Sequence, residues 1–241
     1  MTKDVEFLID VVKQASELVT EEFEINAKGE NGDLVTNFDF EIEKFIIDKI
    51  KDKYPEFDIV SEEFNTKFEV PQNCFLIDPI DGTINFAHGV PMWAIQVACV
   101  KNGEMCASVV YAPRLNELYY ADESGAYLNG KKIHVSKLQM DKVIYSVEGK
   151  LARRKVIEKI ETILPSINLR HFYTCAIEYA YVARGAMGIL AFVNDTPWDY
   201  YPGFYLVKQA GGYLYNEPGM HIAGNSKEIV DLFVREMKKK T

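Results

Sequence analysis

The stretch Asp78-Pro79-Ile80-Asp81-Gly82-Thr83 decides how this chain folds and what it can bind. It follows the apolar run Cys74-Phe75-Leu76-Ile77, which predicts a short buried strand. Two carboxylates, a glycine and a hydroxyl are thereby delivered to the edge of a sheet. Glycine lets the backbone approach a ligand closely, and a helix that begins after Thr83 would offer free amide groups to an anion. The pattern predicts a site for metal ions and phosphate.

The composition is that of a globular chain with an acidic surplus. Its 241 residues fit one large domain or two small ones, and 48% are hydrophobic while 26% are charged. The formal net charge of −9 argues against general binding of nucleic acids or anionic membranes, so we expect neither as a partner. A phosphorylated substrate stays compatible, because bound cations can reverse the local field.

Export and disulfide bonding are not expected. Lys3, Asp4 and Glu6 interrupt the first apolar residues, which argues against a signal peptide, and the longest apolar run, Met92 to Val100, has the length of a strand. The four cysteines are scattered and form no CxxC pair, which argues against disulfides and a zinc site. We therefore expect a cytoplasmic protein.

Hydrophobic spacing predicts two α/β halves. The first half begins with helical patterns over Leu8 to Val19 and Ile42 to Ile50, and Phe57 to Val60 reads as a strand. Phe75 to Val147 is mostly strand, with a hairpin turn at Asn129-Gly130.

The second half mixes helices and strands. We expect a domain boundary between residues 147 and 148, with halves 1–147 and 148–241 joined in one compact unit. The elements expected after it are helices over Leu151 to Leu164, Cys175 to Ala183 and Pro197 to Gly211-Gly212, strands over Leu169 to Phe172 and Met187 to Val193, and a last helix after Ser226.

Further acids could complete the site. Glu62 follows a predicted strand, Asp199 ends Thr196-Pro197-Trp198-Asp199, and Asp39 ends Thr36-Asn37-Phe38-Asp39. Magnesium prefers hard oxygen ligands, and several carboxylates with phosphate could hold two or three ions. Each acid also has an ordinary interpretation, because the two Thr-to-Asp segments fit helix capping boxes. Glu62-Glu63 and Asp81-Gly82 fit simple turns.

Taken together, these residues resemble the inositol monophosphatase family of magnesium-dependent phosphatases. The family signature, an acid-Pro-Ile-Asp-Gly-Thr loop that runs into Asn-Phe, matches Asp78 to Phe86. A second signature, Trp-Asp followed by Gly-Gly, matches Trp198-Asp199 and Gly211-Gly212. Glu62-Glu63 and the segment Asp33 to Asp39 fall in the matching order, so the resemblance runs over nearly the whole chain.

The resemblance implies a layered αβαβα sandwich of the inositol monophosphatase and fructose-1,6-bisphosphatase type, with the site between the halves. It also implies two or three Mg²⁺ ions, a lithium-sensitive activity and a homodimer. Water activated by metal would attack the phosphorus directly, without a covalent enzyme intermediate. The implied metal ligands are the side chains of Glu62, Asp78, Asp81 and Asp199 and the backbone carbonyl of Ile80.

Further roles follow from the same resemblance. Gly82 and Thr83 would hold phosphate, and Glu62, Thr83 and Asp39 would be catalytic, with Asp39 paired to Thr83 or holding a water of a third metal. Lys28 would belong to a mobile loop that closes over the site.

The substrate is less determined than the chemistry. Phe192 stands where inositol-phosphate enzymes of the family place a glutamate that binds sugar hydroxyls, and its ring cannot accept a hydrogen bond. Asp195 is a candidate to replace this acceptor from nearby, although the sequence does not place it. The expected substrate contacts are Asp81, Thr174, Cys175 and Phe192, although residues of this region could equally be core packing.

Three functions are therefore kept. The first is a magnesium-dependent phosphomonoesterase for a small phosphorylated polyol or sugar, such as inositol 1-phosphate. The second is a fructose-1,6-bisphosphatase, or a phosphatase for NADP or 3′-phosphoadenosine 5′-phosphate, whose base nearby aromatic residues could stack. The third is a regulatory or binding protein without activity. A haloacid-dehalogenase-type phosphatase is disfavoured, because two residues rather than one separate Asp78 from Asp81.

Overall fold

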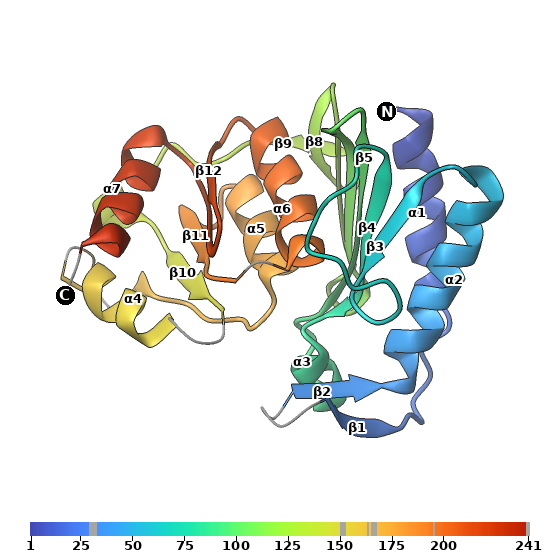
Figure 1. The fold of residues 1–241 in the computed structure, drawn as a ribbon. Coiled ribbons are helices and arrows are strands. Elements are labelled where there is room, and N and C mark those ends of the chain that lie inside the picture. Colours follow the sequence, from blue (N-terminus) through green and yellow to red (C-terminus); the bar gives the residue numbers. More distant parts are fainter. Residues whose placement is uncertain (29–32, 150–152, 163, 165–167, 195, 240–241) are drawn as a thin grey trace.

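The core of the fold consists of two β-sheets, each covered by helices on both faces, and the described residues form a third, two-stranded sheet. The computed structural model describes residues 1–28, 33–149, 153–162, 164, 168–194 and 196–239. Figure 1 shows the five layers edge-on: a helix pair, a large sheet, a central helix pair, a smaller sheet and an outer helix pair. The predicted αβαβα layering is confirmed.

The large sheet has seven strands in sequential order. The first two strands run parallel, and every later neighbour is antiparallel. All eight residues of β4 are buried, because helices cover both faces of the sheet. The strands are β3 (Asp58–Ser61), β4 (Cys74–Asp81), β5 (Ala94–Lys101), β6 (Glu104–Ala112), β7 (Glu117–Asp122), β8 (Gly125–Leu128) and β9 (Lys131–Ile133).

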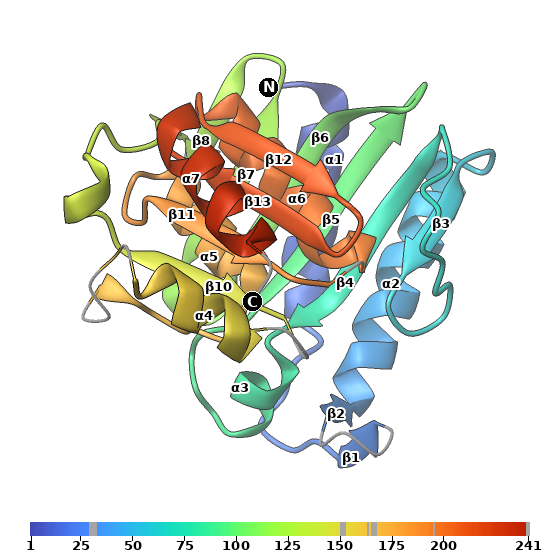
Figure 2. The ribbon, with the colours of Figure 1, turned by 60° about the vertical axis from the view of Figure 1, so that its left-hand side comes forward.

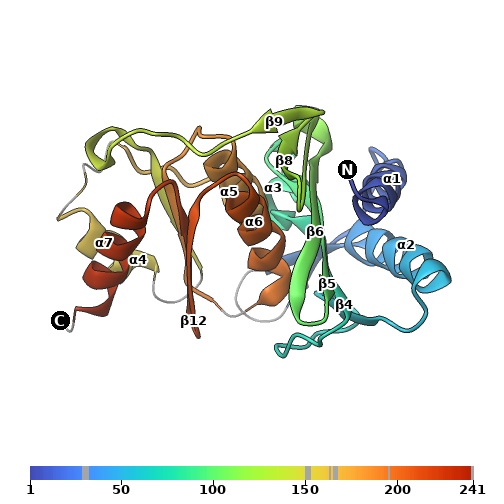
Figure 3. The same cartoon turned by 90° about the horizontal axis from the view of Figure 1, so that it is seen from above.

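Helices α1 (Lys3–Ser16) and α2 (Asn37–Lys53) cover the outer face of this sheet (Figure 3). Each buries one apolar stripe, as the helical spacing predicts. In α2 the stripe contains Ile42, Ile46 and Ile50, all fully buried. Before α2, the antiparallel hairpin of β1 (Ile25–Lys28) and β2 (Asp33–Thr36) lies beside the short helix α3 (Thr83–Ala87).

The smaller sheet has the strand order β10-β11-β13-β12 (Figure 2). Its strands are β10 (Tyr145–Glu148), β11 (Ile189–Phe192), β12 (Tyr213–Glu217) and β13 (Met220–Gly224), and only β10 and β11 pair in parallel. Helices α5 (Cys175–Ala183) and α6 (Pro197–Gln209) separate it from the large sheet, and α4 (Arg153–Ile160) and α7 (Lys227–Lys238) cover its outer face.

Most predicted elements are present within a few residues. Asn129-Gly130 joins β8 to β9, and both residues have the positive φ angles that this turn requires (48° and 82°). Of the helix expected over Leu151 to Leu164, the part seen is α4; residues 151, 152 and 163 lie outside the described residues.

The strand predicted over Leu169 to Phe172 is wrong. Only an isolated bridge joins Leu169 to Tyr145. The reason is that side chains take the backbone groups a ladder would need: Phe172 donates its N–H to Glu178 and accepts at its carbonyl from Asn85, both at 2.7 Å.

No helix within the described ranges is both long enough and apolar enough to span a bilayer.

The contact between α5 and α6 depends on a glycine. A Cβ at Gly203 would lie 2.4 Å from Cβ and Cδ2 of Tyr179, which is buried between the helices. We expect Gly203→Ala to lower the free energy of unfolding by about 1–3 kcal/mol, the usual cost of overpacking. Chemical denaturation measures this, with Lys208→Ala at an exposed position of α6 as the control. Equal stability of the two variants would contradict the packing argument.

Candidate functional site

The candidate site lies where the end of β4 meets the first turns of α5 and α6. After Asp81 the chain turns at Gly82, which has φ +90°. A Cβ at this position would lie 3.0 Å from the Met92 carbonyl oxygen and 3.3 Å from Cβ of Thr174. Glycine is therefore favoured both by the backbone angle and by the close approach of Met92 from the first half and Thr174 from the second.

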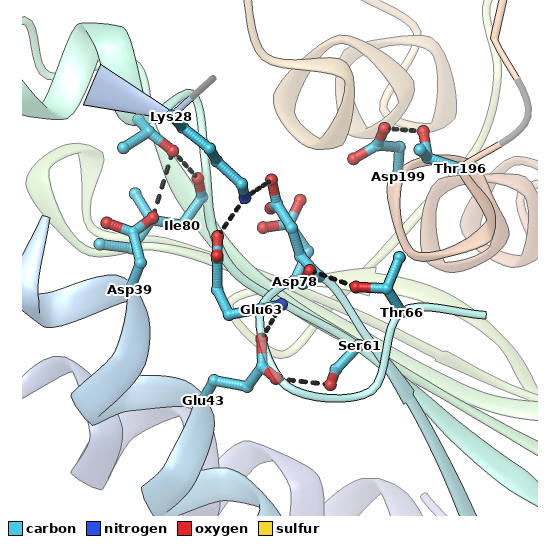
Figure 4. A network of polar contacts seen from close by, with 12 residues as sticks. Lys28, Asp39, Glu43, Ser61, Glu63, Thr66, Asp78, Ile80, Thr196 and Asp199 are labelled. Carbon is cyan, nitrogen blue, oxygen red and sulfur yellow. Dashed lines mark hydrogen bonds and ion pairs between the residues drawn. The ribbon is translucent and has the colours of Figure 1, made fainter. Parts of the chain in front are cut away.

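A register shift between Asp78 and Asp81 interrupts the ladder between β4 and β5. Such irregularities redirect backbone groups away from regular pairing. The carbonyl oxygen of Ile80 lies 2.9 Å from the Thr83 hydroxyl, and Asp39 Oδ1 lies 3.2 Å from the same hydroxyl (Figure 4). Three predicted site residues are thus brought together.

Asp78 is buried without full hydrogen bonding. Its Oδ2 accepts from Gln96 Nε2 at 3.2 Å, whereas its buried Oδ1 has no hydrogen-bond partner among the described residues. Burial, followed by repulsion from Glu62, Asp81 and Asp199, raises the pKa of this carboxyl well above its usual range. A divalent cation would relieve both the desolvation and the repulsion, so the orphaned oxygen fits a metal ligand.

Asp81 joins the two halves. Its carboxylate accepts hydrogen bonds from the Thr174 hydroxyl, from the Ala176 backbone N–H at 2.9 Å and from the Cys175 thiol at 3.4 Å. Burial raises the pKa of Asp81 to about 6, although these hydrogen bonds oppose the shift. The start of α5 therefore holds the second acid of the β4 loop in place.

Asp199 comes from the opposite side, in the first turn of α6 (Figure 4). The Thr196 hydroxyl donates to its Oδ2. Ligand atoms of Asp81, Cys175 and Asp199 all lie within 4.8 Å of one another. Among the described residues, this group could hold a metal ion, and it contains two of the predicted metal ligands.

Glu62 and Glu63 lie opposite a lysine. Lys28 Nζ, at the end of β1, is 2.8 Å from Glu62 Oε1 and 2.5 Å from Glu63 Oε1 (Figure 4). Burial would lower the pKa of Lys28, but the two carboxylates outweigh it and the net shift is upward. The β1–β2 hairpin thus contributes a positive charge beside the predicted metal ligand Glu62.

Asp39 serves a helix cap and the site at once. Its Oδ2 accepts from the Thr36 backbone N–H at 2.7 Å and from the Thr36 hydroxyl at 2.6 Å, while Oδ1 faces Thr83. Burial is the main cause that raises its pKa to about 6. The capping interpretation is therefore confirmed, and the same carboxylate also contacts Thr83, so its catalytic role stays a prediction compatible with the cap.

Glu43 is a residue of this region that the sequence motifs did not predict. This fully buried side chain lies one turn after Asp39 on α2 and accepts from Ser61 Oγ at 2.5 Å and from the backbone N–H groups of Glu63 and Phe64, each at 2.8 Å (Figure 4). It holds the turn that carries Glu62. A glutamate inside the apolar stripe of α2 was the available signal, because unpaired acids are seldom fully buried.

The predicted substrate residues differ in their placement. Thr174 caps α5 and Cys175 is its first residue, so both lie beside Asp81. Phe192 is 5% exposed and packs against Tyr200 and His221. Asp195 lies outside the described residues.

Tyr173 has an unusual backbone. Its φ is +56°, while the other non-glycine residues with positive φ in the described part of the chain are asparagines. Its side chain is 55% exposed and its ring lies 5.9 Å from that of His171. A strained residue next to a site is an indicator of function.

A sequence model of the inositol monophosphatase family matches residues 1–230. The chain belongs to the inositol monophosphatase family. It is 37% identical to a fructose-1,6-bisphosphatase/inositol-1-monophosphatase of Thermotoga maritima over 201 residues, 82% of this chain and 77% of that protein. It is 32% identical to Nus factor SuhB of Escherichia coli over 222 residues, 86% of this chain and 83% of that one.

A solved inositol monophosphatase structure from Thermotoga maritima has the same fold. The two chains align with a TM-score of 0.86 at 30% identity, covering 98% of this chain and 99% of the other. Members of this metal-dependent family hydrolyse phosphate monoesters, so the predictions of family, enzyme class and fold are confirmed.

Replacing Glu43 should loosen the Glu62 turn. In Glu43→Gln an amide NH₂ would face a backbone N–H donor, so we expect a stability loss of about 1–3 kcal/mol. We also expect the Mg²⁺ concentration for half-maximal activity to rise about 10–100-fold, the usual effect of losing a partner that orients a metal ligand. Magnesium titrations of activity measure this. The control is Glu41→Gln, at an exposed position of the same helix; identical titrations would contradict the positioning role.

Glu178 should make stability depend on pH. It is fully buried, and its Oε2 has no hydrogen-bond partner among the described residues. Burial and then repulsion from Glu148 raise its pKa well above the model-compound value of 4.5. The folded state therefore binds a proton that the unfolded state releases, so this group's contribution to stability falls as pH rises from 4.5 through the folded pKa.

Glu178→Gln tests this, because glutamine does not titrate and can still accept from Phe172. We expect the melting temperature of the variant, minus that of the wild type, to increase between pH 5 and pH 8, and thermal scans measure this. Glu228→Gln, exposed at the start of α7, should show no such trend. A difference that stays constant with pH would refute the assignment.

Proposed function

We propose that the protein is a Mg²⁺-dependent phosphomonoesterase for a small phosphorylated polyol or sugar. The observation that carries this proposal is the buried, unpartnered Oδ1 of Asp78 within a group of acids from both halves. Without a cation, so many buried carboxylates repel one another. The proposed ligands are the carboxylates of Glu62, Asp78, Asp81 and Asp199 and the carbonyl of Ile80.

This donor set favours magnesium because all of its atoms are hard oxygens. When bound, two or three such ions would lower the pKa of a water molecule and neutralise charge on the phosphate and the leaving oxygen. Glu62 would orient that water from the turn held by Glu43. The Thr83 hydroxyl, 3.2 Å from Asp39 Oδ1, would accept or pass the proton released there.

Phosphate would be held by the backbone amides of Gly82 and Thr83. The close contact of Gly82 with Met92 and Thr174 supports this, because it fixes the loop and leaves no room for a side chain. Lys28 would contribute positive charge beside Glu62, and its hairpin would cover the bound ester. Direct attack by water requires no nucleophilic side chain, and positioning with charge neutralisation supplies the catalysis.

The residues of the second half that lie near the proposed metal ligands narrow the substrate class. Phe192 packs in the core and offers no acceptor for a sugar hydroxyl, which weakens the case for inositol 1-phosphate itself and leaves Thr174 and Cys175 as the proposed contacts. A fructose-1,6-bisphosphatase activity is the alternative favoured by the name of the Thermotoga relative. A phosphatase for NADP or 3′-phosphoadenosine 5′-phosphate is a further alternative, for which the exposed ring of Tyr173 could stack a base.

Other expectations come from the family alone. Inhibition by lithium, a homodimer and a cytoplasmic location stay predictions. A regulatory role without catalysis is the alternative of another class, and the relative named Nus factor SuhB is the reason to keep it. Phosphate release from a panel of inositol, fructose and nucleotide phosphates, with and without Mg²⁺, separates these functions; no turnover of any substrate would refute the enzyme.

Asp199→Asn should remove most of the activity. The amide lacks the charge needed to hold a cation opposite Asp81, so we expect a loss of roughly 10²–10³-fold, as for other groups that stabilise transition-state charge. Phosphate release at saturating Mg²⁺ measures this. Asp231→Asn, exposed on α7, is the control and should keep full activity. If Asp199→Asn were as active as the control, the metal assignment would fail.

A further inference from the structure

The cluster of Asp81, Cys175 and Asp199 contains an atom that magnesium does not prefer. Cys175 Sγ lies 3.4 Å from Asp81 Oδ1 and 3.5 Å from the Asp199 carbonyl oxygen. The thiol is buried at the first position of α5. Its ligand atom and those of the two acids all lie within 4.8 Å of one another, a spacing that one small cation could span.

A second observation indicates that this point needs a cation. Gln96 Nε2 lies 3.2 Å from Asp78 Oδ2 and 3.3 Å from the Asp199 carbonyl oxygen, which places Asp78 directly beside the cluster. Asp78 is only 1% exposed, and its Oδ1 has no hydrogen-bond partner among the described residues. One carboxylate oxygen next to the cluster, Asp78 Oδ1, is therefore buried without a hydrogen-bond donor among the described residues.

The mixed donor set has its own metal preference. Mg²⁺ takes oxygen ligands and gains little from sulfur. Zn²⁺, Co²⁺ and Cd²⁺ bind thiolate and carboxylate together and accept four-coordinate geometry, so one thiol can raise their affinity selectively. We propose that Asp81, Cys175 and Asp199 form a site for thiophilic divalent cations, which compete with Mg²⁺ for the same carboxylates.

Binding of the cation involves no oxidation or reduction. The Cys175 thiol releases its proton to solvent, the thiolate sulfur donates an electron pair to the incoming cation, and the hydrogen bond to Asp81 is replaced by shared coordination. No bond within the protein is broken. The proposal rests on the metal ligands of the proposed function, but its spectroscopic test does not depend on turnover.

The spacing of the cysteines in the sequence does not predict this site. The scattered cysteines argued against a zinc site in the sequence, and two of them, Cys74 and Cys99, are indeed buried in the large sheet. Cys106, also in that sheet, faces the Cys99 carbonyl oxygen. Only folding brings Cys175 to carboxylates that come from β4 and α6.

Sulfur-to-metal charge-transfer absorption tests the proposal directly. We expect Co²⁺ or Cd²⁺, added to the full-length protein, to produce an ultraviolet thiolate band that saturates at one ion per chain. The band should be lost in Cys175→Ser and kept in Cys106→Ser, the matched control. Cys175→Ala provides a second variant if the serine disturbs folding. Absence of the band in the wild type, or its persistence in both Cys175 variants, would overturn the site.

Inhibition by Zn²⁺ provides the functional measurement. With each protein referred to its own rate in Mg²⁺ alone, we expect the half-inhibitory Zn²⁺ concentration to rise at least about tenfold in Cys175→Ser, equivalent to about 1.4 kcal/mol. Cys106→Ser should match the wild type, and equal inhibition of the wild type and Cys175→Ser would count against the proposal. A Cys175-dependent band without phosphatase activity would support the site while refuting the proposed function; activity without the band would do the reverse.

Discussion

Mutual repulsion among buried carboxylates is the constraint around which this structure is built. Asp78 and Asp81 leave one strand, Asp199 enters from α6, and burial raises the pKa of both β4 acids. Such a cluster would disperse unless rigid elements held it. Each acid is accordingly fixed by an element of its own: Gln96 of β5 for Asp78, the start of α5 for Asp81, and the Thr196 turn for Asp199. The layered fold is what keeps these like charges close together, as the proposed cation site requires.

Local structure and function use the same atoms here. Thr36 with Asp39 and Thr196 with Asp199 are Thr-to-Asp pairs at helix starts, and in each pair the hydroxyl donates to one carboxylate oxygen. In Asp39 the other oxygen faces Thr83. A cap fixes the side-chain rotamer at little cost, since the helix requires a partner for its first N–H groups in any case. In α2 the capping box therefore holds the carboxylate that faces Thr83, whereas at the start of α6 the Thr196 side chain makes no cap hydrogen bond to the helix backbone.

The sequence predicted what depends on local pattern and failed where distant groups meet. The β4 loop, the α5 boundaries and the Asn129-Gly130 turn all follow from neighbouring residues. Glu43 and Glu178 were missed, because their partners lie on other elements and only the fold shows which backbone N–H groups they satisfy. The false strand before α5 has the same origin: its residues have strand character, yet Glu178 and Asn85 bind the Phe172 backbone and prevent pairing.

That segment also explains why substrate choice is harder to derive than chemistry. Phe172 is tied to Asn85 of α3 through its carbonyl and to Glu178 of α5 through its N–H, and Thr174 is tied to Asp81. Between these hydrogen-bonded residues Tyr173 adopts a positive φ, and its side chain is 55% exposed. The hydrogen bonds on either side offset the conformational strain of this backbone angle. Asn85 and Asp81 belong to the first half and Glu178 belongs to the second. The segment from Phe172 to Thr174 is therefore fixed only when the two halves meet. The proposed substrate contacts therefore depend on how the two halves meet, whereas each proposed metal ligand can be identified within its own sequence motif.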